Sequence, residues 1–228
     1  MSVPYGSDPI HQPLIDDYRR RRGLPLDGSI GPSDAELKYG GVLFNATRLK
    51  NVSLNVVLLD SVSNTVDRDV TRATDVFRDA NLAFIVASRA VLSPAESTAI
   101  LGANGKLDCN AAGPGGVVTP SAEEERLVAA NFFRGRINVY YVPGLVGRMD
   151  AGYTLSGMRA DPVIVMNQSF NASATIIGTL EHELGHALGL DHRGDAFQLM
   201  HDGLRAGSAL IQWEIDLARS SQYAINAP

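Results

Sequence analysis

An eleven-residue stretch from His182 to His192 restricts what this chain can fold into more than any other feature. It reads His-Glu-Leu-Gly-His-Ala-Leu-Gly-Leu-Asp-His. Residues four apart on an α-helix lie on the same face, so His182 and His186 can direct two ring nitrogens at one metal ion. A straight helix would carry His192 away, but Gly189 can adopt the left-handed conformation that ends helices. The stretch therefore predicts a helix, a sharp turn, and a third histidine returned to the first two.

Three imidazoles and one carboxylate at these spacings are typical of a catalytic zinc site, which uses three protein ligands and a water. Neutral ligands leave the full charge of the ion to lower the pKa of that water. Glu183, directly after the first histidine, is placed to act as a general base rather than as a ligand. An ordinary core helix would explain the apolar positions Leu180 and Leu184. It would not explain why four of the five histidines lie between residues 182 and 201.

The pattern H-E-x-x-H-x-x-G-x-x-H, with Met200 eight residues after His192, resembles the metzincin family of zinc endopeptidases. The spacing is closest to that of the matrixin branch. The resemblance implies that His182, His186 and His192 bind zinc and that the substrate is a protein or peptide. It also implies that Glu183 is the general acid/base and that Met200 lies in a tight Met-turn beneath the metal.

Hydrophobic patterning predicts an α/β (α+β) fold. Strands are expected over residues 52–60, 82–87, 137–142 and 163–167, and helices over 67–81, 173–188 and 208–222. Capping boxes at Ser93 and Ser121 predict two further helices, the second running to about Arg134. The element order resembles the metzincin domain. That resemblance implies a twisted, mostly parallel sheet with an antiparallel edge strand, a long active-site helix, and a small C-terminal subdomain with the Met-turn and a terminal helix.

Residues 150–156 predict the edge strand over the active-site cleft. Protease substrates commonly add a strand to such an edge. The candidates for backbone contacts to substrate are therefore Ala151, Gly152, Tyr153 and Thr154. An edge strand that only closes the sheet is an equally good interpretation. The Tyr153 hydroxyl is a further candidate, as a group that stabilises an oxyanion.

Residues 1–41 differ from the rest of the chain, because they contain five prolines and the run Arg19–Arg22. They predict an N-terminal extension, either a prosegment or a linker, ahead of a catalytic domain at residues 42–228. The loop-rich segment 88–120 could hold a structural calcium ion near Asp108, although its carboxylates are sparse. Cys109 is the only cysteine, which excludes an intrachain disulfide.

The net charge of −5 argues against electrostatic binding to nucleic acid or to anionic membranes. No apolar run is long enough for a membrane span, and no signal peptide is visible in the sequence. We expect an enzyme that is secreted or delivered outside the cytoplasm. One alternative is a secretion-system-delivered toxin metallopeptidase with a narrow target range and a cognate inhibitor or immunity protein. Another is a catalytically silent, zinc-stabilised binding module.

Overall fold

The structure is a computed structural model. It describes residues 49–110, 120–147, 150–155, 160–171, 179–192, 194, 198–201 and 208–227. The predicted N-terminal extension and the predicted start of the active-site helix lie outside the described residues. No described helix has the length and apolarity needed to cross a membrane.

Strands and helices are interspersed along the described chain. The strands are β1 (Lys50–Leu58), β2 (Leu82–Val91), β3 (Leu107–Asp108), β4 (Ile137–Val142), β5 (Leu145–Val146), β6 (Gly152–Leu155), β7 (Val163–Asn167) and β8 (Ala224–Asn226). The helices are α3 (Val66–Val76), α4 (Pro94–Leu101), α5 (Ala122–Ala129), α6 (Gln168–Asn171), α7 (Thr179–Ala187) and α8 (Gln212–Ser220), with short 3-10 turns at Arg78–Ala80 and Gly102–Asn104.

The main sheet has the strand order β2-β1-β4-β7-β6. The pairs β1–β2, β1–β4 and β4–β7 are parallel, and β6 runs antiparallel to β7 at the edge. The short β8 pairs antiparallel with the start of β1. The predicted fold class, a mostly parallel sheet with an antiparallel edge strand, is therefore confirmed.

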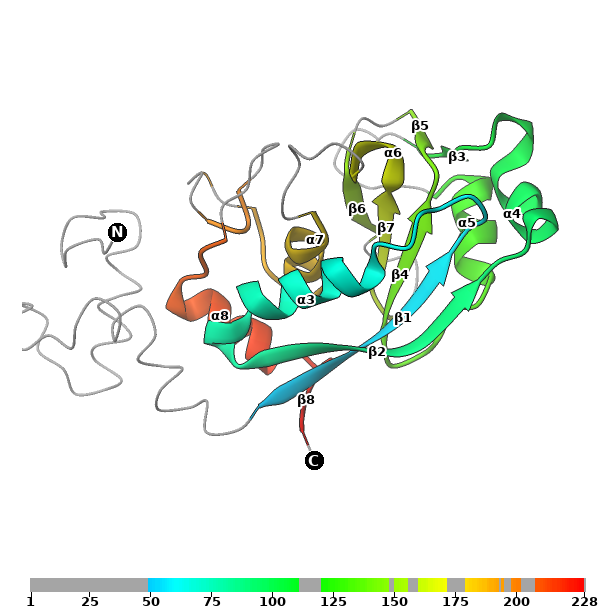
Figure 1. The fold of residues 1–228 in the computed structure, drawn as a ribbon. Helices are drawn as coiled ribbons and strands as arrows, with labels where there is room; N and C mark the ends of the chain where they lie inside the picture. The colour runs from blue at the N-terminus through cyan, green and yellow to red at the C-terminus, as the bar shows by residue number, and fades with distance from the viewer. Residues whose placement is uncertain are drawn as a thin grey trace, which may run out of the picture.

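Two hydrophobic clusters cover the two faces of this sheet, because alternate residues of each strand point to opposite faces. On β4, Ile137, Val139 and Tyr141 belong to the cluster under α3, α7 and α8, whereas Tyr140 and Val142 belong to the cluster under α4 and α5. Figure 1 shows α3 and α7 together over one part of the sheet, with α4 and α5 at the far end. Helix α7, which carries His182 and His186, thus packs on the first of these clusters.

Several element boundaries differ from the predicted ones. The predicted helix 67–81 ends at Val76 and gives way to a 3-10 turn, and Asn81 then has a positive φ of 50°. The helix predicted to reach Arg134 ends at Ala129. Beyond it, the buried Asn138 side chain binds the backbone N–H and C=O of Phe133, which fastens this loop to the sheet. Side-chain bonds to a loop backbone, such as these, are not visible in helix periodicity.

Candidate metal centre

Helix α7 ends in the way that the glycine spacing predicts. Gly189 has a φ of +96°, its N–H donates to the His186 carbonyl (2.9 Å), and the Leu190 N–H donates to the Gly185 carbonyl (2.9 Å). This pair of bonds is the Schellman arrangement, which satisfies carbonyls that the helix end would otherwise leave bare. The chain reverses at Gly189, and His192 follows three residues after it. The sharp turn predicted at Gly189 is confirmed.

The three histidines of the predicted site converge on one point. The Nε2 atoms lie 3.1 Å apart for His182 and His186, 3.2 Å for His182 and His192, and 3.0 Å for His186 and His192. In a tetrahedral zinc site with bonds of about 2.0–2.1 Å, ligand nitrogens are about 3.3 Å apart. The observed spacing is close to that value. Among the described residues, these three form the group of His, Cys, Asp or Glu side chains that could hold a metal ion.

Backbone carbonyls fix the chemical form of two of these rings. The His182 Nδ1 lies 2.8 Å from the Leu199 carbonyl oxygen, and the His186 Nδ1 lies 2.8 Å from the Leu190 carbonyl oxygen. A carbonyl can only accept, so each Nδ1 carries the proton, and in the neutral ring each Nε2 presents a lone pair. Two lone pairs 3.1 Å apart repel unless a cation lies between them. The site therefore fits a metal ion better than a hydrogen-bonded histidine cluster.

The Glu183 side chain reaches the edge strand β6. It is buried, with 7% exposure, and its carboxylate Oε2 accepts a hydrogen bond from Thr154 Oγ1 (2.8 Å) on β6. Glu183 is not part of the group of metal-ligating side chains. Glu183 thus follows the first histidine in the chain, and its carboxylate bonds the edge strand.

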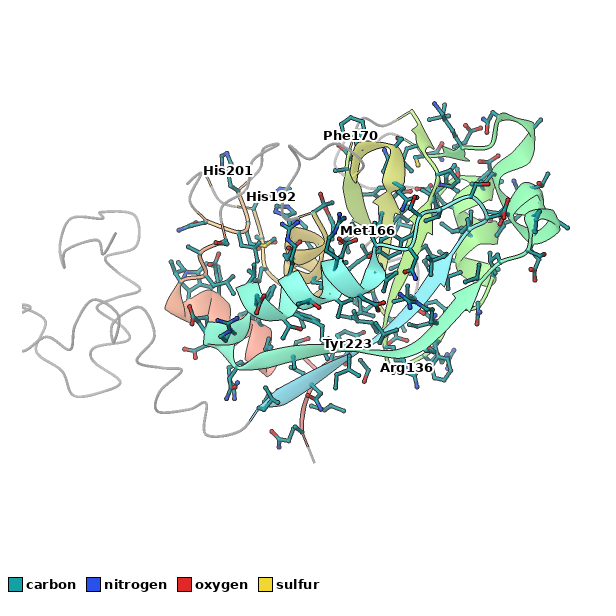
Figure 2. All side chains as sticks on the ribbon, viewed as in Figure 1. Arg136, Met166, Phe170, His192, His201 and Tyr223 are labelled. Carbon is teal, nitrogen blue, oxygen red and sulfur yellow. The ribbon has the colours of Figure 1, made fainter. Side chains whose placement is uncertain are left out.

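Met200 lies in a turn that also holds a histidine. The His201 N–H donates to the Gln198 carbonyl (3.3 Å) and closes the turn, in which Leu199 supplies the carbonyl for His182. The Met200 side chain is fully buried against Gly185 of α7. The structure therefore packs Met200 against α7, the helix that carries His182 and His186. In Figure 2, His192 stands beside α7, with His201 on the same side of the molecule.

A buried ionic contact fixes α7 to α3. Glu181, next to the first histidine, is 2% exposed and lies 3.2 Å from the Arg72 guanidinium on α3. Burial raises the pKa of the Glu181 carboxyl, and Arg72 partly opposes that shift. On the same face of the sheet, the Tyr141 hydroxyl donates to Asp69 of α3 (3.2 Å). The Arg72–Glu181 contact joins α7 to α3, and the Tyr141–Asp69 bond joins α3 to β4.

The four edge-strand candidates divide into two kinds. The Asn167 N–H donates to the Ala151 carbonyl (2.9 Å), so in the antiparallel ladder Ala151 and Tyr153 direct their backbone groups toward β7. Gly152 and Thr154 direct theirs away from β7. Thr154 is half-buried and Gly152 is buried. The two residues that face outward, Gly152 and Thr154, remain the predicted backbone contacts to substrate.

The predicted role of the Tyr153 hydroxyl as an oxyanion stabiliser is wrong. Tyr153 lies in the hydrophobic cluster on the sheet face opposite α7. Its hydroxyl donates to the buried Glu124 carboxylate (2.7 Å) and contacts the Cys109 sulfur at 3.1 Å. Burial, with Cys109 and Glu124 nearby, raises the pKa of Tyr153 above its ordinary value. The strict alternation of side chains along β6 places Tyr153 and Thr154 on opposite faces.

The predicted calcium site finds no support in the described part of segment 88–120. The Asp108 carboxylate accepts from Asn104 (3.4 Å), and the Asp108 N–H donates to Glu123 (2.7 Å). No metal-ligating group forms around Asp108 within the described residues.

Sequence reasoning missed the side-chain role of Thr154, the two orienting carbonyls and the close packing at Gly185. The alternation along residues 150–156 contained one usable signal, because it places Thr154 and not Tyr153 on the same face as Gly152. The carbonyls of Leu190 and Leu199 left no signal in the sequence, since every residue has one.

No protein-family model and no curated protein sequence matches the chain. Among solved structures, archaemetzincin from Methanopyrus kandleri aligns with a TM-score of 0.47 and 15% identity, over 74% of this chain and 94% of that chain. Metalloproteinase-II from Bacteroides fragilis aligns with a TM-score of 0.43 and 10% identity, over 74% of this chain and 52% of that chain.

Proposed function

We propose that this chain is a zinc-dependent endopeptidase of the metzincin type. One observation supports this above all others. Three Nε2 atoms lie 3.0–3.2 Å apart, and carbonyl bonds hold two of the rings in the tautomer that binds a cation. A buried carboxylate, Glu183, follows the first of these histidines in the chain and reaches the edge strand.

His182, His186 and His192 are the residues that would hold the zinc ion. When bound, zinc lowers the pKa of a coordinated water and polarises the scissile carbonyl. Glu183 accepts the proton of the attacking water as the new C–O bond forms, and it later gives that proton to the leaving amine as the C–N bond breaks. The outward backbone groups of Gly152 and Thr154 align an extended substrate beside this carboxylate. Met200, packed under α7, supports the metal-bearing helix.

The composition of the site favours catalysis over a purely structural role. Structural zinc sites usually close all four positions with protein ligands, whereas catalytic sites keep one open. Within the described ranges three ligating side chains come together, and His192 is exposed. Asp202, a candidate fourth ligand, lies outside the described residues. A structural site also has no use for a carboxylate held where Glu183 is held.

The test is cleavage of a diverse peptide library by the zinc-loaded full chain, read by mass spectrometry. Glu183→Ala is the paired control, since it removes the base and leaves all three histidines. We expect cuts that disappear in Glu183→Ala while both proteins keep about one zinc per chain. The cleavage sites would also define the side-chain preference.

Two results would overturn the proposal of an endopeptidase that cleaves many peptides with Glu183 as its base. Equal cleavage by both proteins would show that Glu183 takes no part. Bound zinc with no cleavage by wild type would favour a narrow-target toxin or a zinc-stabilised binding module. A shortened protein that begins after residue 41 then separates latency from inactivity, because release of activity would identify residues 1–41 as an inhibitory prosegment.

A further inference from the structure

We propose that Thr154 is a positioning residue that orients the Glu183 carboxylate for proton transfer. This inference rests on the proposed peptidase function and goes beyond it. The observation is the 2.8 Å hydrogen bond between Thr154 Oγ1 on the edge strand and Glu183 Oε2 on α7.

The direction of this bond follows from the chemistry of the two groups. Thr154 Oγ1 also lies 3.2 Å from the Glu183 backbone carbonyl, but a hydroxyl has one proton to donate. The carboxylate is closer and ionised, and bonds to ionised acceptors are shorter and about twice as strong as neutral ones. Thr154 therefore donates to the carboxylate.

The fold makes this contact specific. Along β6, Tyr153 and Leu155 belong to the hydrophobic cluster on the far face, so Thr154 faces α7. The register with β7 directs the Thr154 backbone groups to the outer edge of the sheet. A single residue thus presents its backbone to the substrate edge and its hydroxyl to the base. The edge strand and the base are held in fixed relation by one side chain.

A held carboxylate matters because proton transfer depends on geometry. A glutamate side chain has three rotatable bonds, and a base must lie within hydrogen-bond reach of the proton that it abstracts. Fixing one oxygen removes most of the alternative orientations of the carboxylate. Side-chain bonds that orient a reactive group act on the turnover step more than on substrate binding.

The experiment compares three variants with wild type in steady-state cleavage of a peptide identified from the library. Thr154→Val keeps the branched shape and removes the hydroxyl, whereas Thr154→Ser keeps the hydroxyl. Thr71→Val is the matched control, because Thr71 is exposed and, among the described residues, its hydroxyl bonds the Asp67 carbonyl of its own helix α3. Zinc content and melting temperature are measured for each protein, and Thr154→Val is also made in the Glu183→Ala background.

We expect Thr154→Val to lower kcat about tenfold, with KM within about twofold of wild type, which is the size of effect that one charge-assisted hydrogen bond supports. Thr154→Ser should recover most of that loss, and Thr71→Val should match wild type. In the Glu183→Ala background, Thr154→Val should lower the residual rate no further, because the group it positions is gone.

The inference is overturned if Thr154→Val keeps the wild-type kcat, or if Thr154→Ser loses as much as Thr154→Val. It is also overturned if the loss is accompanied by lost zinc or by a raised KM alone. Crystal structures of wild type and Thr154→Val give a readout that is independent of activity. A Glu183 carboxylate that stays in place without the hydroxyl contradicts the proposal, whereas a carboxylate that turns away supports it. Absence of cleavage by wild type would count against the peptidase proposal, and these structures would still decide the role of Thr154.

Discussion

Replacing Gly185 by alanine tests the packing between the metal-site helix and the turn that holds Met200. A Cβ atom at residue 185 would lie 2.3 Å from the Met200 sulfur and 3.1 Å from its terminal carbon. Ordinary contacts between such atoms are about 3.5–4.0 Å, so the sulfur must retreat by more than about 1 Å. Met200 is fully buried and has no solvent to retreat into.

The expected magnitude is a balance of two effects. Alanine in a helix interior is more favourable than glycine by about 0.5–1 kcal/mol. Overpacking a closed core costs about 1–3 kcal/mol. From the middle of each range, the net destabilisation of Gly185→Ala should be about 1 kcal/mol, which lowers the melting temperature by about 2–4 °C for a domain of this size. Because the Leu199 carbonyl next to Met200 orients His182, zinc affinity should also fall by about tenfold.

The assay is thermal and urea unfolding of the metal-free protein, followed by zinc titration against a competing chelator. Gly194→Ala is the control, since a Cβ there meets no atom of the described residues within 4 Å and should change stability by less than about 0.5 kcal/mol. Met200→Ala, made in both backgrounds, measures the coupling. It should cost about 1 kcal/mol less when residue 185 is alanine, because the smaller side chain relieves the clash. A Gly185→Ala protein as stable as wild type, with unchanged zinc affinity, would refute the reasoning.

Three further predictions concern buried hydroxyls and the metal. Tyr153→Phe should lower the free energy of unfolding at neutral pH by about 2 kcal/mol in a urea titration, because the buried Glu124 carboxylate loses a donor; an unchanged urea midpoint would contradict this. Burial beside Asp69 raises the pKa of Tyr141 above its ordinary value, so the folded state keeps this proton while the unfolded state loses it above about pH 10. The contribution of Tyr141 to the free energy of unfolding is complete below that pH and is lost above it by up to about 1.4 kcal/mol per pH unit. The free energy of unfolding of Tyr141→Phe, measured against pH, should therefore decline less steeply above about pH 10 than that of wild type. Zinc at 100 times its dissociation constant should stabilise wild type by about 2.7 kcal/mol in thermal unfolding, and His192→Ala, with an exposed ligand removed, should lose most of that gain without loss of metal-free stability.

Local features of the sequence were sufficient for the parts of the fold that depend on near neighbours. The strands at residues 137–142 and 163–167 match β4 and β7, and both capping boxes are present. Both strands are buried throughout and are apolar apart from one asparagine each, which is typical of parallel strands covered on both faces. The helix boundaries were less predictable, because the Asn138 side chain on the next strand, β4, bonds the backbone of the loop after α5, and helix periodicity does not show such a bond.

The convergence of the metal site follows from residue spacing within one short stretch of the chain. His182 and His186 share a helix face by periodicity alone, and Gly189 ends that helix at a positive φ, so no distant contact is needed to return His192 to them. The His186 ring is also fixed locally, by the Leu190 carbonyl four residues later. The orientation of His182 and Glu183 depends instead on tertiary contacts. The Leu199 carbonyl, from the turn that holds Met200, fixes the His182 ring. Strand register decided that Thr154, and not Tyr153, reaches Glu183. Helix spacing is a property of a few adjacent residues, whereas the face that an edge strand presents depends on its pairing with β7 and on the helix that packs across it.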